Sequence, residues 1–235
     1  MDQTPSTARL TVITPTLNEE SNIDRMITRL VSLYPQVSII VADDGSTDKT
    51  AEIVRNWGNK NPKIRFLDRK DEPVKGLTIS LVDAIKITST DFFFVIDCDF
   101  QHPPERIADG LLLLSEGNQL VIGSRSSVEG WGFRRKLISW GATTLGKISL
   151  LIRRRPRPKD IMSGFFGGET QFIAEILDQH PKTVSPKGYK LLFDMLKVLP
   201  RKTSIGEFSY TFQTREAGES KISLKHILVY FRSLF

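Results

Sequence analysis

A run of five apolar residues, Phe92 to Ile96, constrains the fold more than any other stretch of the chain. An uninterrupted apolar run of this length is typical of a strand buried on both faces, as in the middle of a parallel sheet. The run leads into Asp97 and Asp99, and residues two apart on a continuing strand share a face. Ligands of open α/β sheets bind beyond the carboxyl ends of the strands, so the sequence predicts a site here.

Two carboxylates and an amide then alternate along the chain, at Asp97, Asp99 and Gln101. Hard oxygen ligands of this kind suit Mg²⁺ or Mn²⁺ bound to a diphosphate. A bare Asp-x-Asp is common, and taken alone it is more often a pair of solvated acids in a loop. Its position after a buried strand favours the metal site. His102, which precedes two prolines, is expected to be a positioned loop residue rather than a metal ligand.

Strands and helices alternate along the first half of the chain. Strands are predicted at 10–14, 37–42, 64–67, 92–96 and 120–123, and helices from about 21 to 34, 50–57, 76–87 and from 104 onward. This alternation predicts an α/β fold with a mostly parallel, right-handed, doubly wound sheet. No Gly-x-Gly-x-x-Gly follows the first strand, and acids and amides stand at the strand ends instead. That pattern favours a nucleotide-sugar over a dinucleotide.

The second half is expected to complete the same domain. A glycine-rich turn region at 160–168 is predicted to bend back to the sheet, followed by helices at 171–178 and 189–199 and a strand at 205–212. A final amphipathic helix is predicted at 222–235, with its apolar stripe on one face. We therefore expect one catalytic domain over residues 1–221 and an interface helix over 222–235, which can also be the start of a missing membrane segment.

The charge and composition of the chain indicate which classes of binding partner to expect. The net charge of +6 makes an anionic partner plausible, and the single cysteine, Cys98, excludes an intrachain disulfide. Between Gly132 and Lys159 there are nine basic residues and no acidic one, interleaved with aliphatic residues. This pattern favours contact with a membrane surface. The alternative is a nucleic-acid-binding protein. Against it, the residues interleaved with the basic ones are mainly aliphatic and not the aromatic residues on which bases stack. No window approaches the ~18 unbroken apolar residues of a spanning helix.

Together these motifs resemble the family 2 inverting glycosyltransferases of the GT-A fold. More narrowly, they resemble the polyprenol-phosphate sugar transferases, dolichol-phosphate mannose synthases among them. The broad motifs lie at 15–19, 43–46 and 97–99, and the narrower ones at 99–104, 122–125, 135–139, 160–166 and 218–221. The chain departs from the pattern at Leu17, where many relatives carry tyrosine, and at Ile161, where proline is common.

The resemblance implies inverting transfer of mannose from GDP-mannose to dolichol (polyprenol) phosphate. It also implies Mg²⁺ or Mn²⁺ as cofactor and a peripheral location on the cytoplasmic face of a membrane. The alternative is the same transfer with another sugar, such as glucose from a UDP donor, because no residue that selects the base is legible. A lipid phosphate is already ionised at pH 7, since the second pKa of a phosphate is near ~6, so no strong general base is needed. Asp160 remains open as a base for a hydroxyl acceptor.

The resemblance also implies roles for single residues. Implied catalytic residues are Asp99, Arg125, Arg135 and Asp160. Implied nucleotide-sugar-binding residues are Pro15, Thr16, Asn18, Glu19, Ala42, Asp44, Gly76, Asp97, Cys98, Asp99, Gln101, Arg215 and Lys221, and implied metal ligands are Asp97, Asp99 and Gln101. Read without the resemblance, Glu19 and Asp44 are equally well explained as helix caps.

Overall fold

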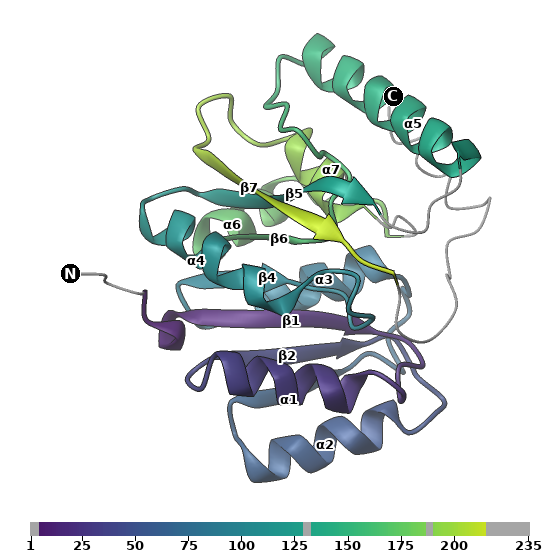
Figure 1. Cartoon of the computed structure of the whole chain (residues 1–235), viewed down its shortest axis with the longest axis vertical. Helices are drawn as coiled ribbons and strands as arrows, with labels where there is room; N and C mark the ends of the chain where they lie inside the picture. Colours follow the sequence, from purple (N-terminus) through teal and green to yellow (C-terminus); the bar gives the residue numbers. More distant parts are fainter. Residues whose placement is uncertain (1–4, 129–132, 187–189, 215–235) are drawn as a thin grey trace.

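The computed structural model describes residues 5–128, 133–186 and 190–214, and Figure 1 shows their arrangement. The strands are β1 (Leu10–Thr16), β2 (Ser38–Asp43), β3 (Ile64–Asp68), β4 (Phe92–Val95), β5 (Leu120–Val128), β6 (Phe166–Glu169) and β7 (Ile205–Phe212). The α-helices are α1 (Ile23–Leu33), α2 (Thr50–Lys60), α3 (Leu77–Lys86), α4 (Ile107–Ser115), α5 (Phe133–Ile152), α6 (Thr170–Gln179) and α7 (Leu191–Leu196). Short 3-10 helices η1 (Thr7–Arg9) and η2 (Pro104–Arg106) precede β1 and α4.

The strands form one sheet in the order β3-β2-β1-β4-β6-β5-β7. β1, β2, β3 and β4 pair in parallel, as do β5 and β7, whereas β6 runs antiparallel to both of its neighbours. The predicted α/β fold with a mostly parallel sheet is therefore confirmed. The helix predicted at 189–199 is shorter than expected and covers only Leu191–Leu196.

Strand β6 corrects the prediction of a glycine-rich turn. The segment enters the sheet between β4 and β5, and its two glycines are needed there. A Cβ on Gly167 would lie 2.4 Å from Cδ2 of Phe94, and one on Gly168 would lie 2.9 Å from Cγ1 of Ile173. Glycine weakens a strand in isolation. The pattern therefore indicated a turn, while the close approach of the Phe94 ring requires glycine in a strand.

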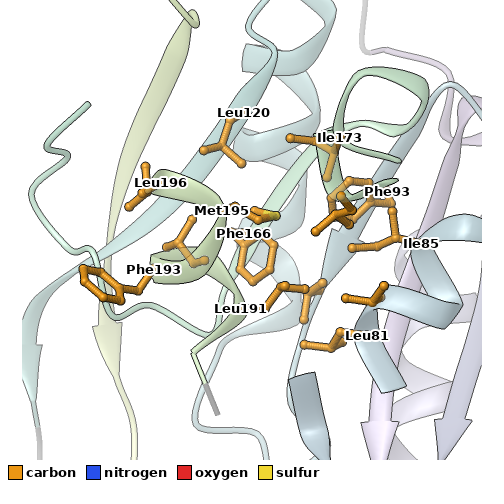
Figure 2. Close-up of a cluster of buried hydrophobic side chains, with 14 of the residues drawn as sticks. Leu81, Ile85, Phe93, Leu120, Phe166, Ile173, Leu191, Phe193, Met195 and Leu196 are labelled. Atoms are coloured by element: carbon orange, nitrogen blue, oxygen red, sulfur yellow. The ribbon is translucent and has the colours of Figure 1, made fainter. Parts of the chain in front are cut away.

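The predicted buried strand is confirmed as β4. All four residues of β4 are buried, and their side chains pack in two separate hydrophobic cores. Phe93 packs in the core beneath α3, α6 and α7, while Phe94 packs in the core beneath α1, α2 and α4, as strand alternation requires. Figure 2 shows the first of these cores, where Phe93, Phe166 and Leu191 converge from a central strand, its antiparallel neighbour and α7. A strand with an apolar core on both faces is firmly positioned, and so is the loop that follows it.

Helix α5 lies at the periphery of the molecule, at the top right of Figure 1. Leu150 is buried against the core, but the opposite side of the helix exposes large apolar side chains. These are Trp140, Leu145, Ile148, Leu151 and Ile152. Among the described residues, no helix combines the length and the hydropathy needed to cross a membrane. The amphipathic helix predicted at 222–235 lies outside the described residues.

Candidate functional site

The carboxyl ends of β1 and β2 lie side by side and bring together the first group of predicted site residues. Pro15 pairs with Ala42 and Thr16 with Asp43 along the parallel ladder. The buried Asp43 carboxylate accepts hydrogen bonds from Thr16 Oγ1 at 3.0 Å and from the backbone N–H of Ser46 at 2.8 Å. Asp43 therefore stabilises the turn after β2, in which Gly45 takes the left-handed conformation that glycine adopts without strain (φ +95°).

Asp44 belongs to a buried ionic network. Its Oδ1 accepts from Nη1 of Arg69 at 2.6 Å, and its Oδ2 accepts from the N–H of Gly76 at 2.7 Å, just before α3. Arg69 is only 2% exposed and also binds Asp83 through Nε at 2.8 Å. The network joins the end of β2 to the loop before α3, so it fixes where Asp44 and Gly76 lie.

Sequence reasoning missed Arg69, although an arginine two residues after the predicted strand 64–67 was a usable signal. Buried arginines occur almost only when paired with acids. Two acids after a strand, as at Asp43 and Asp44, therefore make a nearby basic partner worth seeking.

The loop after β1 is fastened to the loop after β2. Asn18 has a positive φ of 54°, and its Oδ1 accepts from the N–H of Thr47 at 2.8 Å. The N–H of Glu19 donates to Thr50 Oγ1 at 2.9 Å, and its carboxylate accepts from the side chain of Asn22 at 2.9 Å. The Glu19 carboxylate thus binds the side chain of Asn22, the residue before α1, and this contact is not the bond to a backbone N–H that defines a helix cap. These contacts hold both loops at the edge of the sheet where β1 and β2 end, next to Pro15 and Ala42.

The acids after β4 differ in environment more than strand periodicity predicts. β4 ends at Val95, so both acids lie in the following turn rather than on a continuing strand, which corrects the expected geometry. The Asp97 side chain is 42% exposed, whereas Asp99 is buried and accepts from the N–H of Gln101 at 3.1 Å. Gln101 is held in turn by Gln213, to whose carbonyl its Nε2 donates at 3.2 Å. Cys98, between the acids, is buried.

These residues suit a divalent ion only if other ligands complete its shell. Within the part of the chain that the structure describes, no group of three or more His, Cys, Asp or Glu side chains could hold a metal. Two carboxylates and an amide oxygen are hard donors that leave several positions of an octahedral ion open. The donor set therefore fits Mg²⁺ or Mn²⁺ whose remaining ligands are water and phosphate oxygens.

Arg125 and Asp160 form a second centre, on the far side of β6. Nε and Nη2 of Arg125 donate to the two Asp160 oxygens at 2.6 and 2.9 Å. Burial alone would raise the pKa of Asp160, but the hydrogen bonds and charge of Arg125 outweigh it and hold that pKa below 3.8. At neutral pH the pair is therefore a carboxylate and a guanidinium.

Lys190 completes this centre, and sequence reasoning did not identify it. Its Nζ donates to the carbonyl of Met162 at 2.7 Å, two residues beyond Asp160. Burial and the charge of Arg125 lower the pKa of Lys190 from 10.5 to about 8, against the opposing effect of Asp160 and Asp97. Nothing in the local pattern around residue 190 distinguished it from other lysines, because only the fold brings it to Arg125.

His102 lies between the two centres. Its ring stacks on Phe165 with centroids 5.2 Å apart and planes 9° apart, and the edges of Tyr210 and Phe212 pack beside it. Burial, then the charges of Arg125 and Lys190, lower the pKa of His102 to about 3, while Asp160 opposes this shift. The imidazole is therefore neutral.

The structure thus places the predicted residues at adjacent strand ends. Pro15, Thr16, Asn18, Glu19, Ala42, Asp44 and Gly76 border β1 and β2; Asp97, Cys98, Asp99 and Gln101 follow β4; Arg125 and Asp160 lie across β6. The side chain of Arg135, and all of Arg215 and Lys221, lie outside what the structure describes. A cavity of about 640 Å³, between α1 and η2, contains Arg25, Phe100 and Gln213 but none of the predicted site residues.

Comparison with known proteins agrees with this arrangement. Residues 11–177 match the family model described as "Glycosyl transferase family 2". A "Dolichol-phosphate mannosyltransferase" of Pyrococcus furiosus is 34% identical over 97% of this chain, which spans 63% of that relative's length. A relative from Mycosarcoma maydis with the same name is 31% identical to this chain. The match covers 98% of this chain and 79% of that relative's length.

Solved structures agree on the fold. Glucosyl-3-phosphoglycerate synthase from Mycobacterium tuberculosis, in complex with Mn²⁺, UDP and glucosyl-3-phosphoglycerate, superposes with a TM-score of 0.65. That similarity covers 97% of this chain and 78% of the other, at 21% identity.

Proposed function

The chain belongs to glycosyl transferase family 2, and from that premise we propose that it transfers mannose from GDP-mannose to a polyprenol phosphate such as dolichol phosphate. The names of the relatives support the transfer of mannose and the polyprenol phosphate class of acceptor. One observation in the structure carries the proposal: acids suited to a metal-bound diphosphate lie near a buried basic centre suited to a second phosphate. The acids are Asp97 and Asp99, and the basic centre is Arg125 with Lys190.

The donor is proposed to bind along the ends of β1, β2 and β4. Pro15, Ala42 and Asp44 border the nucleoside side, and Asp97, Asp99 and Gln101 the diphosphate side. Mn²⁺ or Mg²⁺, as in the solved complexes of the glucosyl-3-phosphoglycerate synthase, would be held by these two acids and this amide. The bound ion would offset the negative charge that grows on the departing diphosphate.

Arg125 and Lys190 are proposed to aim the acceptor phosphate. A guanidinium matches phosphate oxygens with two parallel donors. Here Asp160 already occupies Nε and Nη2 of Arg125 and so fixes the plane of the guanidinium. We therefore assign Asp160 to orienting Arg125. Its depressed pKa makes it a weak proton acceptor, and an ionised phosphate oxygen needs no base to attack the sugar. One displacement at the anomeric carbon inverts its configuration.

A long-chain polyprenol phosphate stays in the bilayer, so the site must work at headgroup level. The exposed apolar side chains of α5 and the basic residues that follow them supply a surface for this. Arg153 and Arg154, directly after Ile152, and Arg157, five residues after it, are exposed. Apolar burial together with attraction to anionic lipids gives reversible binding. We propose peripheral attachment through α5, on the cytoplasmic face.

A transfer assay tests the proposal. Radiolabelled GDP-mannose or UDP-glucose is incubated with the protein, Mn²⁺ and a polyprenyl phosphate, and lipid-soluble label is counted. We expect label from GDP-mannose, lost when a chelator removes the metal. The matched acceptor without phosphate, polyprenol, should gain none. If only UDP-glucose labels the lipid, the donor is the alternative one and the mannose proposal is wrong. If neither donor labels the lipid, the proposed function is refuted.

A further inference from the structure

The imidazole of His102 and the carboxylate of Asp97 face each other at the end of β4. Nδ1 of His102 lies 3.6 Å from Oδ2 of Asp97. Gly164 lies against both groups: a Cβ there would be 3.3 Å from Asp97 Oδ2 and 3.4 Å from His102 Cε1. The absence of a side chain at Gly164 therefore lets the ring and the carboxylate approach each other.

Three aromatic residues hold the ring in place. Phe165 stacks on one face of the imidazole, and Tyr210 and Phe212 of β7 contact it at steep angles. His102 is only 2% exposed. A ring clamped in this way keeps the direction of its nitrogens, so Nδ1 stays directed at Asp97.

The surroundings of Nδ1 indicate which nitrogen carries the proton. Nδ1 is buried and makes no hydrogen bond to any described residue. An imidazole carries at least one N–H, and a ring nitrogen without a proton presents a lone pair. A lone pair aimed at a carboxylate would repel it, whereas an N–H would be attracted. The proton therefore belongs on Nδ1.

We propose that His102 is a positioning residue that orients Asp97 as a metal ligand, through a hydrogen bond from Nδ1–H to Oδ2. The 3.6 Å separation is longer than a hydrogen bond. Hydrogen bonds of this kind are often long in unliganded enzymes and tighten in the complex. With Oδ2 held by His102, the carboxylate presents its other oxygen to the ion. The assignment rests on the proposed metal-bound donor.

Packing alone is the competing explanation, and substitutions separate the two. His102→Phe keeps an aromatic ring between Phe165 and Phe212 but removes Nδ1. His102→Asn places an amide N–H near the position of Nδ1. His102→Gln places the same group farther out, near the position of Nε2. The Asn and Gln variants thus carry the same amide group and differ by one methylene, which changes where the donor lies.

The measurement is Mn²⁺ binding in the presence of GDP, followed by electron paramagnetic resonance, with thermal melting as a check on folding. Loss of an outer-shell partner typically weakens metal binding about 10- to 100-fold. We expect a loss in that range for His102→Phe, with a melting temperature close to wild type. We expect His102→Asn to bind Mn²⁺ about tenfold more tightly than His102→Gln does.

The results that would overturn the role of His102 differ from the result that would overturn the proposed function. Wild-type affinity in His102→Phe would leave the imidazole a packing role only and overturn the proposal. So would equal affinities in the Asn and Gln variants, a comparison that holds even if the Phe variant does not fold. If the wild-type protein itself binds no Mn²⁺ with GDP or with UDP, the metal step of the proposed function fails, and the role of His102 fails with it.

Discussion

Arg125 binds both carboxylate oxygens of Asp160, and both side chains are largely buried, at 15% and 10% exposure. Such a pair depends on both partners, since a lone buried charge is costly. The pair links β5 to the segment that leads into β6, so it couples the basic centre to the middle of the sheet.

Replacing one partner should therefore destabilise the protein. We expect Asp160→Asn to lower the free energy of unfolding by about 3–5 kcal/mol, because it leaves the Arg125 guanidinium without its counter-charge. Urea denaturation measures this. The double variant Arg125→Met/Asp160→Leu, which removes both charges, should recover most of the loss. A single variant as stable as wild type would show that the pair is solvated and energetically minor.

The same pair predicts a response to acid. The pKa of Asp160 is lower in the folded chain than its ordinary value of 3.8. Between these two values the unfolded chain binds more protons. The contribution of Asp160 to stability is therefore complete above about pH 5 and is lost as the pH falls through 3.8 toward the folded pKa. Denaturation curves between pH 6 and pH 3 should show a steeper loss in wild type than in Asp160→Asn. Parallel curves would contradict the shift.

The two acids after β4 should respond differently to substitution. Asp97→Asn should leave the melting temperature nearly unchanged, because its side chain is 42% exposed. Asp99→Ala should destabilise the fold by about 1–3 kcal/mol, because it leaves the partly buried N–H of Gln101 without its acceptor. Both variants should lose Mn²⁺-dependent binding of GDP. Calorimetric titration with and without Mn²⁺ checks this, and unchanged affinity in both would mean that these acids hold no metal.

Gly110 should tolerate no side chain. A Cβ there would lie 2.2 Å from Cε2 of Phe94, whose ring also blocks Gly167. Gly110→Ala must displace that ring from a packed core and should cost about 1–3 kcal/mol. Gly141→Ala is the matched control, because no atom of the part of the chain that the structure describes lies within 4 Å of its Cβ position in α5. Helix propensity predicts that the control is neutral or more stable by up to about 1 kcal/mol. Equal effects of the two variants on thermal melting would contradict this packing.

Membrane attachment should depend on the exposed face of α5. Ile148 and Leu151 are 46% and 52% exposed, so changing both to Asp should release the protein from anionic liposomes without loss of stability. Leu112→Asp, at a 47% exposed leucine of α4, is the control and should stay bound. Liposome sedimentation measures binding. Transfer to a long-chain acceptor should fall, while transfer to a short, water-soluble polyprenyl phosphate should persist. Early melting of the double variant would mean that α5 packs on protein instead.

The sequence by itself determined the parts of the fold that follow from local patterns. The apolar run from Phe92 placed the central buried strand, and alternation with helices placed β1 to β3 in the same parallel sheet. Parallel strands share a carboxyl edge, so Pro15, Ala42 and Asp97 could be assigned to one edge without knowing any contact. The late strand 205–212 was also predicted with its correct bounds. Each of these signals is periodic and lies within one segment.

Only the tertiary structure decided the rest, because the causes lie in residues far apart along the chain. The segment from Phe166 forms a strand because it pairs with β4, and the ring of Phe94 leaves room only for glycine at the paired position 167. Asp44 has a fixed place because Arg69, 25 residues later, reaches back to it. Asp97 is exposed and Asp99 buried because β4 ends early, where periodicity no longer applies. His102 faces Asp97 because Phe165 and β7 clamp its ring, and no local pattern carries that information.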